Sequence, residues 1–553
     1  MINKKCFLPV FALHLLLLAS PVVAQSVYHV NISSGDDSND GLQWSSALMN
    51  IQPAIDLAVE GDVILVAEGV YHPTEKIPVV FRKNGTPADE RHRSFYINKN
   101  VALLGGFPRN SSDATVISDR DWQLYRTVLS GDFDENDGYD FENMDENAYH
   151  VVVLINASPS LVLNGFQITG GCADDASTSY LDENQNLYVT GSDGGGIYAY
   201  SRDQASSPTI TDVSFYGNYA QDAGGAMFNF SYANDASPQM TNVSIVHNKA
   251  KYRHGGGLFN NAGGAVYAKL TNLNVVGNES TMSGGGLYFT SIEKCSPVIV
   301  NAVVNGNLSN GGNGGGIYIS TFSGDAEPVI TNTTICGNSV KRGSITNDGG
   351  GLVVLPVGVS KTSILNTVIW GNKGIDIDNF HAESKDWGEA NIISGSFIEG
   401  FDGLGTSNLP GNIDPKFLEP VLANLAPTID GDYQLMPGSP LINKGLNASI
   451  TVSTDLLGNT RIFDGTVDIG AYEFQGVTPI INETITNEKT IWCNSGCLYV
   501  RINESATLRV YALDGTLVKH IHKLDEGLYE FPIPRGFYVV TLSNGITEKI
   551  AVR

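Results

Sequence analysis

The chain of 553 residues is poor in charge, in cysteine and in long apolar runs. Charged residues make up 16% of it, against a usual share of about 25%, which excludes a coiled coil or a charge-rich helical protein. Lysine and arginine number 33 against 58 aspartates and glutamates, so the net charge is −25. Because such an excess of carboxylates repels phosphate backbones, we expect no nucleic-acid partner.

Cysteine is too scarce for a disulfide scaffold, with six residues in the whole chain. Cys6 lies in the leader described next, so five cysteines remain and at least one thiol is unpaired within the chain. Cys493 and Cys497 are close enough in sequence to close a small loop in an oxidising compartment. The cysteines and histidines nowhere show the spacing of a zinc site.

Residues 1–24 have the pattern of a secretory signal peptide. Lys4 and Lys5 precede an apolar run from Phe11 to Ala19, and small residues end at Ala24, where cleavage is expected. The apolar run is too short to cross a bilayer, and no later segment reaches 18 apolar residues. We therefore expect an exported protein without a membrane-spanning helix.

Glycine is abundant instead, at 61 residues, and much of it recurs in a repeat. A glycine-rich triplet followed by two apolar residues begins at Gly194, Gly224, Gly255, Gly284, Gly314 and Gly349, in steps of 29 to 35 residues. An alternating apolar and polar stretch follows each triplet and ends in asparagine, at Asn218, Asn248, Asn278, Asn307, Asn338 and Asn372. Alternation of period two is typical of strands with one buried face.

These repeats predict a β-solenoid, because one coil of about 30 residues cannot bury its inner face alone and stacked coils can. The glycines suit a tight corner with close backbone approach. The six asparagines suit turns at positive φ, and their stacked side chains can hydrogen-bond along the axis as a structural ladder. Parallel crossovers are right-handed, and we extend that hand to the coils. The predicted fold is all-β: a right-handed parallel β-helix followed by a small C-terminal β-sandwich.

The chain divides into successive segments on this interpretation. Residues 25–150 hold a capping amphipathic helix at 46–59 and the first coils, and 151–400 hold the repeats. Residues 401–476 form the last coils, and 477–490 are a polar linker. Residues 491–553 hold short alternating strands, with Asp514-Gly515 and Asn544-Gly545 placed as hairpin turns.

The chain resembles secreted parallel β-helix proteins with a pectin-lyase-like fold, in stretches such as Gly61-Asp-Val-Ile-Leu-Val-Ala-Glu-Gly-Val-Tyr71. The glycine-triplet coils are similar to repeats of polymorphic outer-membrane proteins, and Asp455 to Glu473 resembles a choice-of-anchor Q domain. The last 65 or so residues resemble a type IX secretion sorting domain, through Gly536-Phe-Tyr-Val-Val540 and the terminal strand. The resemblance implies a β-helix but no particular activity, since this fold carries many functions.

Two charged clusters are candidate sites. The acidic stretch 132–147 holds eight carboxylates, and Asp132, Asp134 and Asn136 alternate as calcium ligands do; a solvated acidic loop is the plainer interpretation. A basic cluster follows at 247–254, where Lys251, Arg253 and His254 are the residue types that a polysaccharide lyase would need. A solvated turn is again the plainer interpretation.

The motifs of known β-helix enzymes are missing. We find neither the Trp-Ile-Asp-His stretch of pectate lyases nor the Gly-His-Gly stretch of polygalacturonases, and only Asp174-Asp175 matches in part. Arg461, Asp468 and Glu473 are interpreted as a structural ion pair in the last coil. Five aromatic residues in one register, Tyr198, Phe228, Phe259, Tyr288 and Tyr318, form either an outward sugar-binding row or a core stack.

We therefore interpret the protein as non-catalytic and adhesin-like, contacting a polysaccharide or a host or cell-surface glycan. The alternative is a divergent polysaccharide lyase or glycoside hydrolase, and a second alternative is a structural spacer. No cofactor is expected, apart from the calcium that the acidic stretch suggests. The leader and the tail predict a protein of the extracellular space or the outer-membrane surface of a Gram-negative bacterium, with the type IX secretion machinery as a partner.

Overall fold

The structure, a computed structural model, describes most of the chain after residue 24. It covers residues 25–77, 81–82, 89–181, 188–342, 349–375, 377–382, 391–401, 406–476, 491–494, 497–502, 505–512, 517–524, 526–533, 536–543 and 546–552. The predicted signal peptide, 1–24, the predicted linker, 477–490, and the two predicted hairpin dipeptides lie outside these residues.

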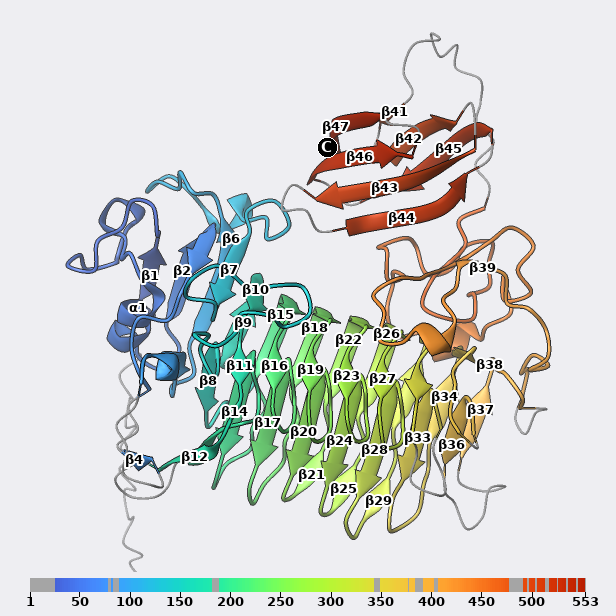
Figure 1. Cartoon of the computed structure of the whole chain (residues 1–553), viewed down its shortest axis with the longest axis horizontal. Helices are drawn as coiled ribbons and strands as arrows, with labels where there is room; N and C mark the ends of the chain where they lie inside the picture. The colour runs from blue at the N-terminus through green and yellow to red at the C-terminus, as the bar shows by residue number, and fades with distance from the viewer. Residues whose placement is uncertain are drawn as a thin grey trace, which may run out of the picture.

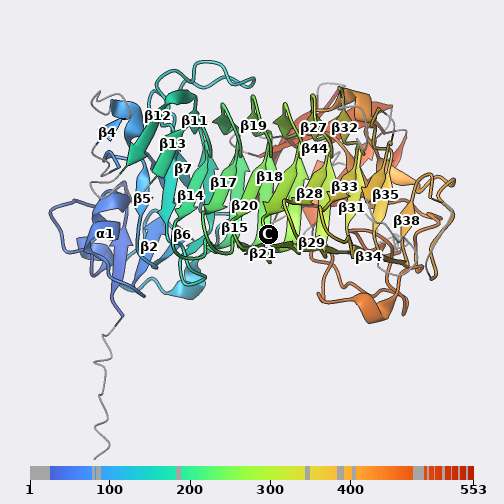
Figure 2. The ribbon, with the colours of Figure 1, turned by 90° about the horizontal axis from the view of Figure 1, so that it is seen from below.

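The main body is a right-handed parallel β-helix, which confirms the predicted fold class (Figures 1 and 2). Its largest sheet has 17 strands among the described residues. They are β1 Val27–Val30, β2 Val63–Ala67, β3 Gly69–Tyr71, β6 Ala102–Phe107, β7 Thr127–Ser130, β9 Val162–Asn164, β10 Phe166–Thr169, β15 Thr209–Tyr216, β18 Gln239–Val246, β22 Lys269–Val276, β26 Val298–Asn305, β30 Val329–Thr331, β31 Thr334–Cys336, β34 Ser363–Leu365, β35 Val368–Trp370, β37 Ile392–Ser394 and β38 Phe397–Ile398.

A second sheet of nine described strands forms another wall of the coil. It consists of β5 Phe95–Ile97, β8 Val152–Ile155, β14 Ile197–Ser201, β17 Met227–Ser231, β20 Leu258–Ala262, β24 Leu287–Ser291, β28 Ile317–Thr321, β33 Leu352–Leu355 and β36 Phe380–Ala382. A narrow six-stranded sheet consists of β11 Cys172–Ala173, β16 Tyr219–Ala220, β19 Lys249–Ala250, β23 Glu279–Ser280, β27 Leu308–Ser309 and β32 Ser339–Val340. A three-stranded sheet consists of β21 Ala265–Val266, β25 Lys294–Cys295 and β29 Asp325–Ala326.

Two small antiparallel sheets flank the solenoid. One contains β4 Phe81–Arg82, β12 Asp175–Leu181 and β13 Tyr188–Gly191, and the other pairs β39 Phe417–Glu419 with β40 Asp432–Leu435. Short 3-10 turns lie at η1 Trp44–Ser46, η2 Glu90–His92, η3 Ile117–Asp119, η4 Ala423–Leu425 and η5 Asn447–Ser449. These elements do not follow the coil repeat and lie outside its parallel sheets.

The core runs along the inside of the coils in strict register. In the nine-stranded sheet neighbouring coils pair residue for residue, as where Met227 of β17 pairs with Leu258 of β20 and Leu258 with Leu287 of β24. These inward side chains are fully buried. Because side chains alternate between the two faces of a strand, the residue after each of them points outward.

The glycine triplets mark the corner before the nine-stranded sheet. Gly224, Gly255 and Gly284 have φ between 65° and 72°, the left-handed region in which glycine is at no disadvantage. At the second position a side chain would not fit, because a β-carbon on Gly256 would lie 2.4 Å from the carbonyl oxygens of Glu279 and Gly285. Both properties match the tight corner and close approach expected from the sequence.

A short helix stands at the first coil. The predicted helix at 46–59 is wrong in extent, since α1 spans only Ile51–Leu57. Ile51 and Ile55 are buried as predicted, but Val59 lies beyond the helix and is 52% exposed. The chain leaves the helix at Ala58, where the backbone turns extended and leads into β2. The described residues contain no helix long and apolar enough to cross a membrane.

The C-terminal residues form a small antiparallel β-sandwich, also as predicted. One sheet contains β41 Ile491–Asn494, β42 Cys497–Ile502 and β45 Gly527–Pro532. The other contains β44 Leu517–Leu524, β43 Ala506–Ala512, β46 Gly536–Leu542 and β47 Thr547–Val552. Their inner faces share a core of their own that includes Leu498, Val510 and Val540. The sequence patterns missed β41 and β45.

Candidate functional site

A ladder of buried amides runs along the solenoid through all six predicted asparagines. The side-chain nitrogen of Asn248 donates to the side-chain oxygen of Asn278 at 3.0 Å, and the same bond links each member to the next at 2.8–3.0 Å. The last predicted member, Asn372, continues the chain to Asn379, which the 30-residue spacing did not reveal. The ladder therefore joins consecutive coils through fully satisfied side chains.

The predicted positive φ of these asparagines is wrong. The left-handed residue is the one before, glycine in five coils and His247 in the sixth, with φ of 53–65°. A second row of left-handed residues consists of Asp212, Asn242, Asn272, Asn301, Asn332 and Asn366. Asn272 donates to Asn242, and Asn242 to Asp212, at 2.8 and 2.9 Å. Asparagine, which tolerates this conformation, therefore occupies a left-handed position within the strand stretch, and not the one at its end.

The five aromatic residues in one register stack on the outer face of the nine-stranded sheet, in hydrophobic clusters separate from the main core. Tyr198, Phe259 and Tyr288 are buried there, so the stack is present as expected but lies outside the coil. Neighbouring rings stack with centroids 5.1–5.2 Å apart and interplanar angles of 3–14°. Inside the row, each ring face is therefore covered by the next ring, and His150 lies 5.1 Å from Tyr198 at one end. A sugar needs a free ring face to stack on, so the stack is better suited to holding coils together than to binding glycan.

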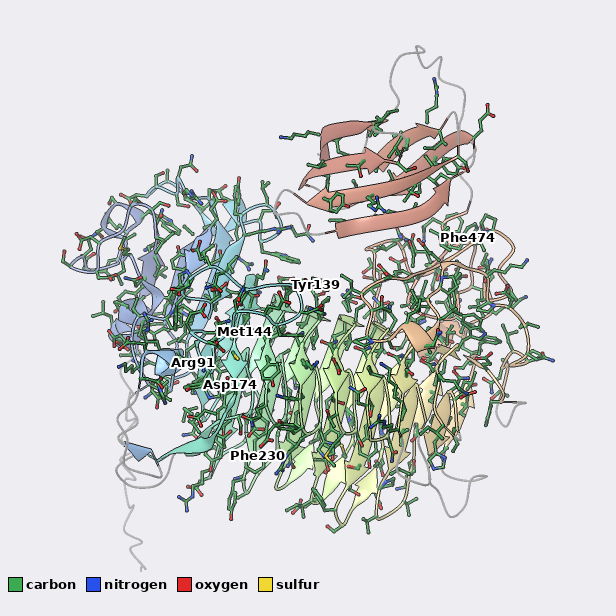
Figure 3. The ribbon with its side chains drawn as sticks, in the orientation of Figure 1. Arg91, Tyr139, Met144, Asp174, Phe230 and Phe474 are labelled. Atoms are coloured by element: carbon green, nitrogen blue, oxygen red, sulfur yellow. The ribbon has the colours of Figure 1, made fainter. Side chains whose placement is uncertain are left out.

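The acidic stretch folds into a flap over the narrow sheet. We call residues 132–147 the acidic flap; its base is closed by a hydrogen bond from Ala148 to Gly131, at 2.8 Å. Its far end reaches three coils along the axis, where the rings of Tyr139 and Phe141 stack on His247 with centroids 4.6 and 5.0 Å away. Figure 3 shows Tyr139 and Met144 on this loop. The two charged clusters of the sequence therefore meet in space.

A cleft of about 310 Å³ lies between the acidic flap and the coils. We call it the flap cleft; it is lined by Phe141, Asn143, Met144, Asp145, Cys172, Asp174, Tyr219, Gln221 and Lys251. Its volume is at the lower end of the range of roughly 300–1,000 Å³ that small-ligand sites occupy. The side-chain oxygen of Gln221 is buried there, and none of the described residues donates a hydrogen bond to it. The cleft thus offers a polar atom that a ligand could satisfy.

Arg91 fixes one wall of the flap cleft. Its guanidinium donates to the carboxylate of Asp174 at 2.8 Å and to the backbone oxygens of Cys172 and Asn147 at 2.9 and 2.7 Å (Figure 3). Burial raises the pKa of the Cys172 thiol to about 12 and also raises that of the Tyr219 phenol. Neither group is therefore ionised at neutral pH.

The three basic residues proposed as alternative catalytic groups have separate partners. Lys251 lines the flap cleft, is exposed, and its amine lies 5.2 Å from the centroid of the Tyr252 ring. Arg253 lies 3.7 Å from Asp222. The ring of His254 packs on Tyr288 with centroids 4.4 Å apart, and burial lowers its pKa to about 4. Only Lys251 of the three lines the cleft.

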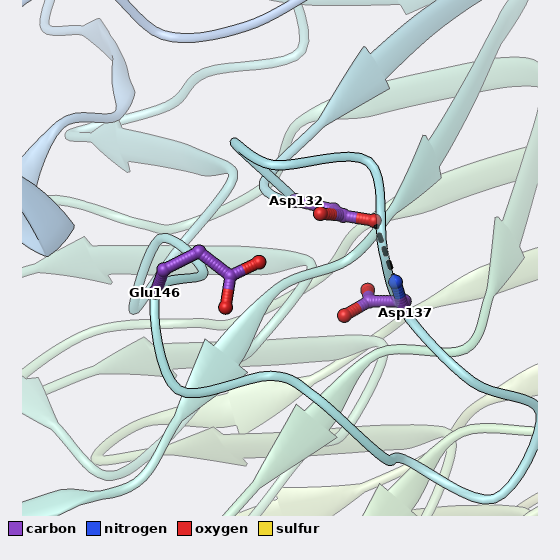
Figure 4. Close-up of side chains that lie close together, drawn as sticks. All are labelled: Asp132, Asp137 and Glu146. Atoms are coloured by element: carbon purple, nitrogen blue, oxygen red, sulfur yellow. Dashed lines mark hydrogen bonds between the residues drawn. The ribbon is translucent and has the colours of Figure 1, made fainter.

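The acidic flap brings a different set of carboxylates together from the predicted one. Carboxylate oxygens of Asp132, Asp137 and Glu146 lie within 4.8 Å of one another (Figure 4). Asp134 does not join them, and Asn136 contacts the group through its backbone N–H, which donates to Asp132. Desolvation and the neighbouring carboxylates raise the pKa of Asp137 to about 6. Mutual repulsion of this kind is what a hard cation relieves, and calcium binding stays a prediction.

Arg461, Asp468 and Glu473 are buried together in the last coil, but not as a direct ion pair. Arg461 donates to the backbone oxygens of Ala471, at 3.0 Å, and Gly470. Both carboxylates accept from backbone N–H groups, and no contact within 4.0 Å joins them to Arg461 in the described part of the chain. Burial lowers the pKa of Arg461 and raises that of Glu473 to about 7. The three groups satisfy the backbone rather than each other.

Comparison with known proteins identifies no family. No protein-family model matches the chain, and no curated protein matches it. Among solved structures, that of pectate lyase Pel9A is 12% identical with a TM-score of 0.37, covering 82% of this chain and 97% of its own. The structure of XylC with xylose is 11% identical with a TM-score of 0.29, covering 69% and 77%. Likenesses this distant carry no argument about activity.

Sequence patterns located the two charged clusters but not the site between them. Tyr219 and Gln221 lie in an ordinary coil, and nothing in the repeat separates them from their equivalents. The one available signal was His247, which occupies the position before the ladder asparagine where the other coils have glycine. The flap cleft exists because residues about 80 positions apart in sequence pack together.

Proposed function

We propose that the protein is a non-catalytic, glycan-contacting surface protein and that the flap cleft is where it binds. The observation that carries this is that two polar groups of the cleft are open to a ligand: the exposed amine of Lys251, and the buried side-chain oxygen of Gln221, which has no donor among the described residues. A glycan supplies hydroxyl groups that donate to the amide oxygen and accept from the amine. Phe141 and Tyr219 add apolar surface beside them.

Binding is favoured over catalysis by the state of the groups in the cleft. Asp174 is held by Arg91, and Cys172 and Tyr219 keep their protons at neutral pH. General acid–base chemistry needs a group that exchanges a proton near the working pH. The alternative function is a divergent polysaccharide lyase or glycoside hydrolase, because Lys251 shares the cleft with Asp145 and Asp174. A structural spacer is the second alternative.

A panel of polysaccharides, scored for both binding and product release, tests the three functions together. We expect the purified protein to bind a member of the panel, and Lys251→Ala or Gln221→Ala to weaken that binding about tenfold or more. Lys269→Ala is the matched control, since Lys269 is an exposed lysine of β22 outside the cleft. Released product that disappears in Lys251→Ala would establish the enzyme, and no binding at all would favour the spacer.

We infer that the C-terminal sandwich directs export. Its support is the resemblance of the last 65 or so residues to type IX sorting domains and their separate core. Together with the leader at 1–24, we propose for the β-helix a location on the surface of a Gram-negative bacterium or outside it, with the type IX secretion machinery as the partner. Deletion of residues 480–553, followed by localisation of the truncated protein, tests this inference.

A further inference from the structure

His247 is the exception in a row of glycines. The residue before each ladder asparagine is Gly217, Gly277, Gly306, Gly337 or Gly371 in the other five coils, all at φ of 61–65°. His247 holds the same left-handed conformation, with φ of 53°, although a β-carbon is disfavoured there. A strained residue kept where glycine would serve points to a role for its side chain.

That side chain contacts the far end of the acidic flap. The plane of its ring is inclined by 20° to that of Tyr139 and by 21° to that of Phe141. The ring centroid also lies 5.8 Å from that of Tyr216 on β15. Its Nε2 lies 2.8 Å from the backbone oxygen of Tyr139, which can only accept, so Nε2 donates. One residue thus provides both stacking and a hydrogen bond to the flap.

The remaining contacts of the flap leave this end dependent on His247. The base is held by Arg91 on Asn147 and by the bond between Ala148 and Gly131. The far end is folded on itself, with Gly138 donating to the backbone oxygen of Glu142 at 2.9 Å. In the described part of the chain, its other ring contacts with the coils are those of Phe141 with the ring of Tyr219, at 6.0 Å, and with the amine of Lys249, at 5.9 Å. Phe141 and Asn143 at this end are also walls of the flap cleft.

We propose that His247 is a positioning residue of the flap cleft: it holds the acidic flap closed so that Phe141 and Asn143 face Gln221 and Lys251. The inference rests on the proposed glycan site. The ligand meets His247 only through the flap, so the loss of His247 weakens binding without removing any group from the cleft. Its backbone strain opposes folding, so the two effects of replacing it have opposite signs.

The test compares His247→Gly with His247→Phe in the full chain. Glycine removes the ring and the strain, so we expect an unchanged or higher melting temperature, with amide exchange of residues 136–143 about tenfold faster and glycan affinity about tenfold weaker. Phenylalanine keeps the ring and should restore much of the protection. Asn242→Gly is the matched control, because it relaxes a left-handed residue of the same coil that does not touch the flap.

The outcomes separate this proposal from the proposed function. Unchanged flap exchange in His247→Gly overturns the positioning role, even where glycan binding persists. Faster exchange with unchanged affinity also overturns it, because the flap would then not shape the site. A wild-type protein that binds no glycan overturns the proposed function instead, while the exchange data still decide whether His247 holds the flap.

Discussion

Asn278 illustrates how much one buried amide does in this fold. Its nitrogen donates to Asn307 and to the backbone oxygens of Ile245 and Val276, and its oxygen accepts from the backbone and side chain of Asn248. Every polar atom of the side chain is satisfied at zero exposure. Removing the side chain would leave the buried backbone N–H of Asn248 without its acceptor, at a cost of about 1–3 kcal/mol, and would take one hydrogen bond each from the side chains of Asn248 and Asn307.

We therefore expect Asn278→Ala to destabilise the β-helix by several kcal/mol, on the order of 3–5, measured by denaturant unfolding. Asn242→Gly, at an exposed position of the second row, should change stability by less than about 1 kcal/mol, because glycine tolerates its left-handed backbone. Equal losses of unfolding free energy in the two variants would mean that the buried ladder stabilises the β-helix no more than the second row does.

Asp193 makes stability depend on pH. Burial, with the nearby Asp222, raises its pKa to about 6, although Thr190 and the backbone of Ala223 donate to it. The folded protein therefore holds this proton more tightly than the unfolded chain. The resulting stabilisation is fully present below the ordinary pKa near 4 and is lost as the pH rises through 6.

We expect the wild type to lose on the order of 2–3 kcal/mol relative to Asp193→Asn between pH 4 and pH 7.5. Unfolding free energies of the two proteins at four or five pH values in that interval give the difference directly. A difference that stays constant, or grows with pH, contradicts the raised pKa.

At the scale of the element, two glycines of one corner triplet look alike in sequence but differ in the space around them. A β-carbon on Gly256 meets two carbonyl oxygens at 2.4 Å, whereas one on Gly257 lies 2.7 Å from a carbonyl oxygen and the methyl end of Ile245. The coil before it carries Ala226 at the third position, so that position accepts a side chain there. We expect Gly256→Ala to lower the melting temperature by at least twice as much as Gly257→Ala. Similar shifts would show that the corner adapts equally at both positions.

The sequence predicted the coils because each one repeats the same local pattern, and it failed where packing depends on distant residues. Triplets and alternation placed the strands from 197 to 370, whereas β41 and β45 of the sandwich have no comparable repeat. Asn379 joins the ladder only seven residues after Asn372, so a period of 30 could not find it. The acidic flap looked like a solvated loop, since its stacking on His247 joins residues more than 100 positions apart.

At the scale of the whole molecule, the sandwich and the β-helix have separate cores. The ion pair of Lys519 with Asp432, at 3.2 Å, links the two. We expect deletion of residues 480–553 to leave the β-helix folded, with a melting temperature within a few degrees of the full chain, but trapped in the periplasm. Fractionation and surface proteolysis of cells that express both forms check this. Normal display of the truncated protein would show that the tail does not direct export.

The residue-for-residue pairing of coils also determines how the molecule carries load. The hydrogen bonds between coils run along the axis. A pull along that axis therefore loads every interface between coils with the same force, and within one interface all the hydrogen bonds share it. The strength of such a rod is set by its weakest interface, whereas its stiffness is shared by every coil. A sideways force instead shears many interfaces at once. A β-helix tethered at one end would therefore resist bending by flow better than it resists peeling from an end, and the short helix α1 lies at the end where such peeling would begin.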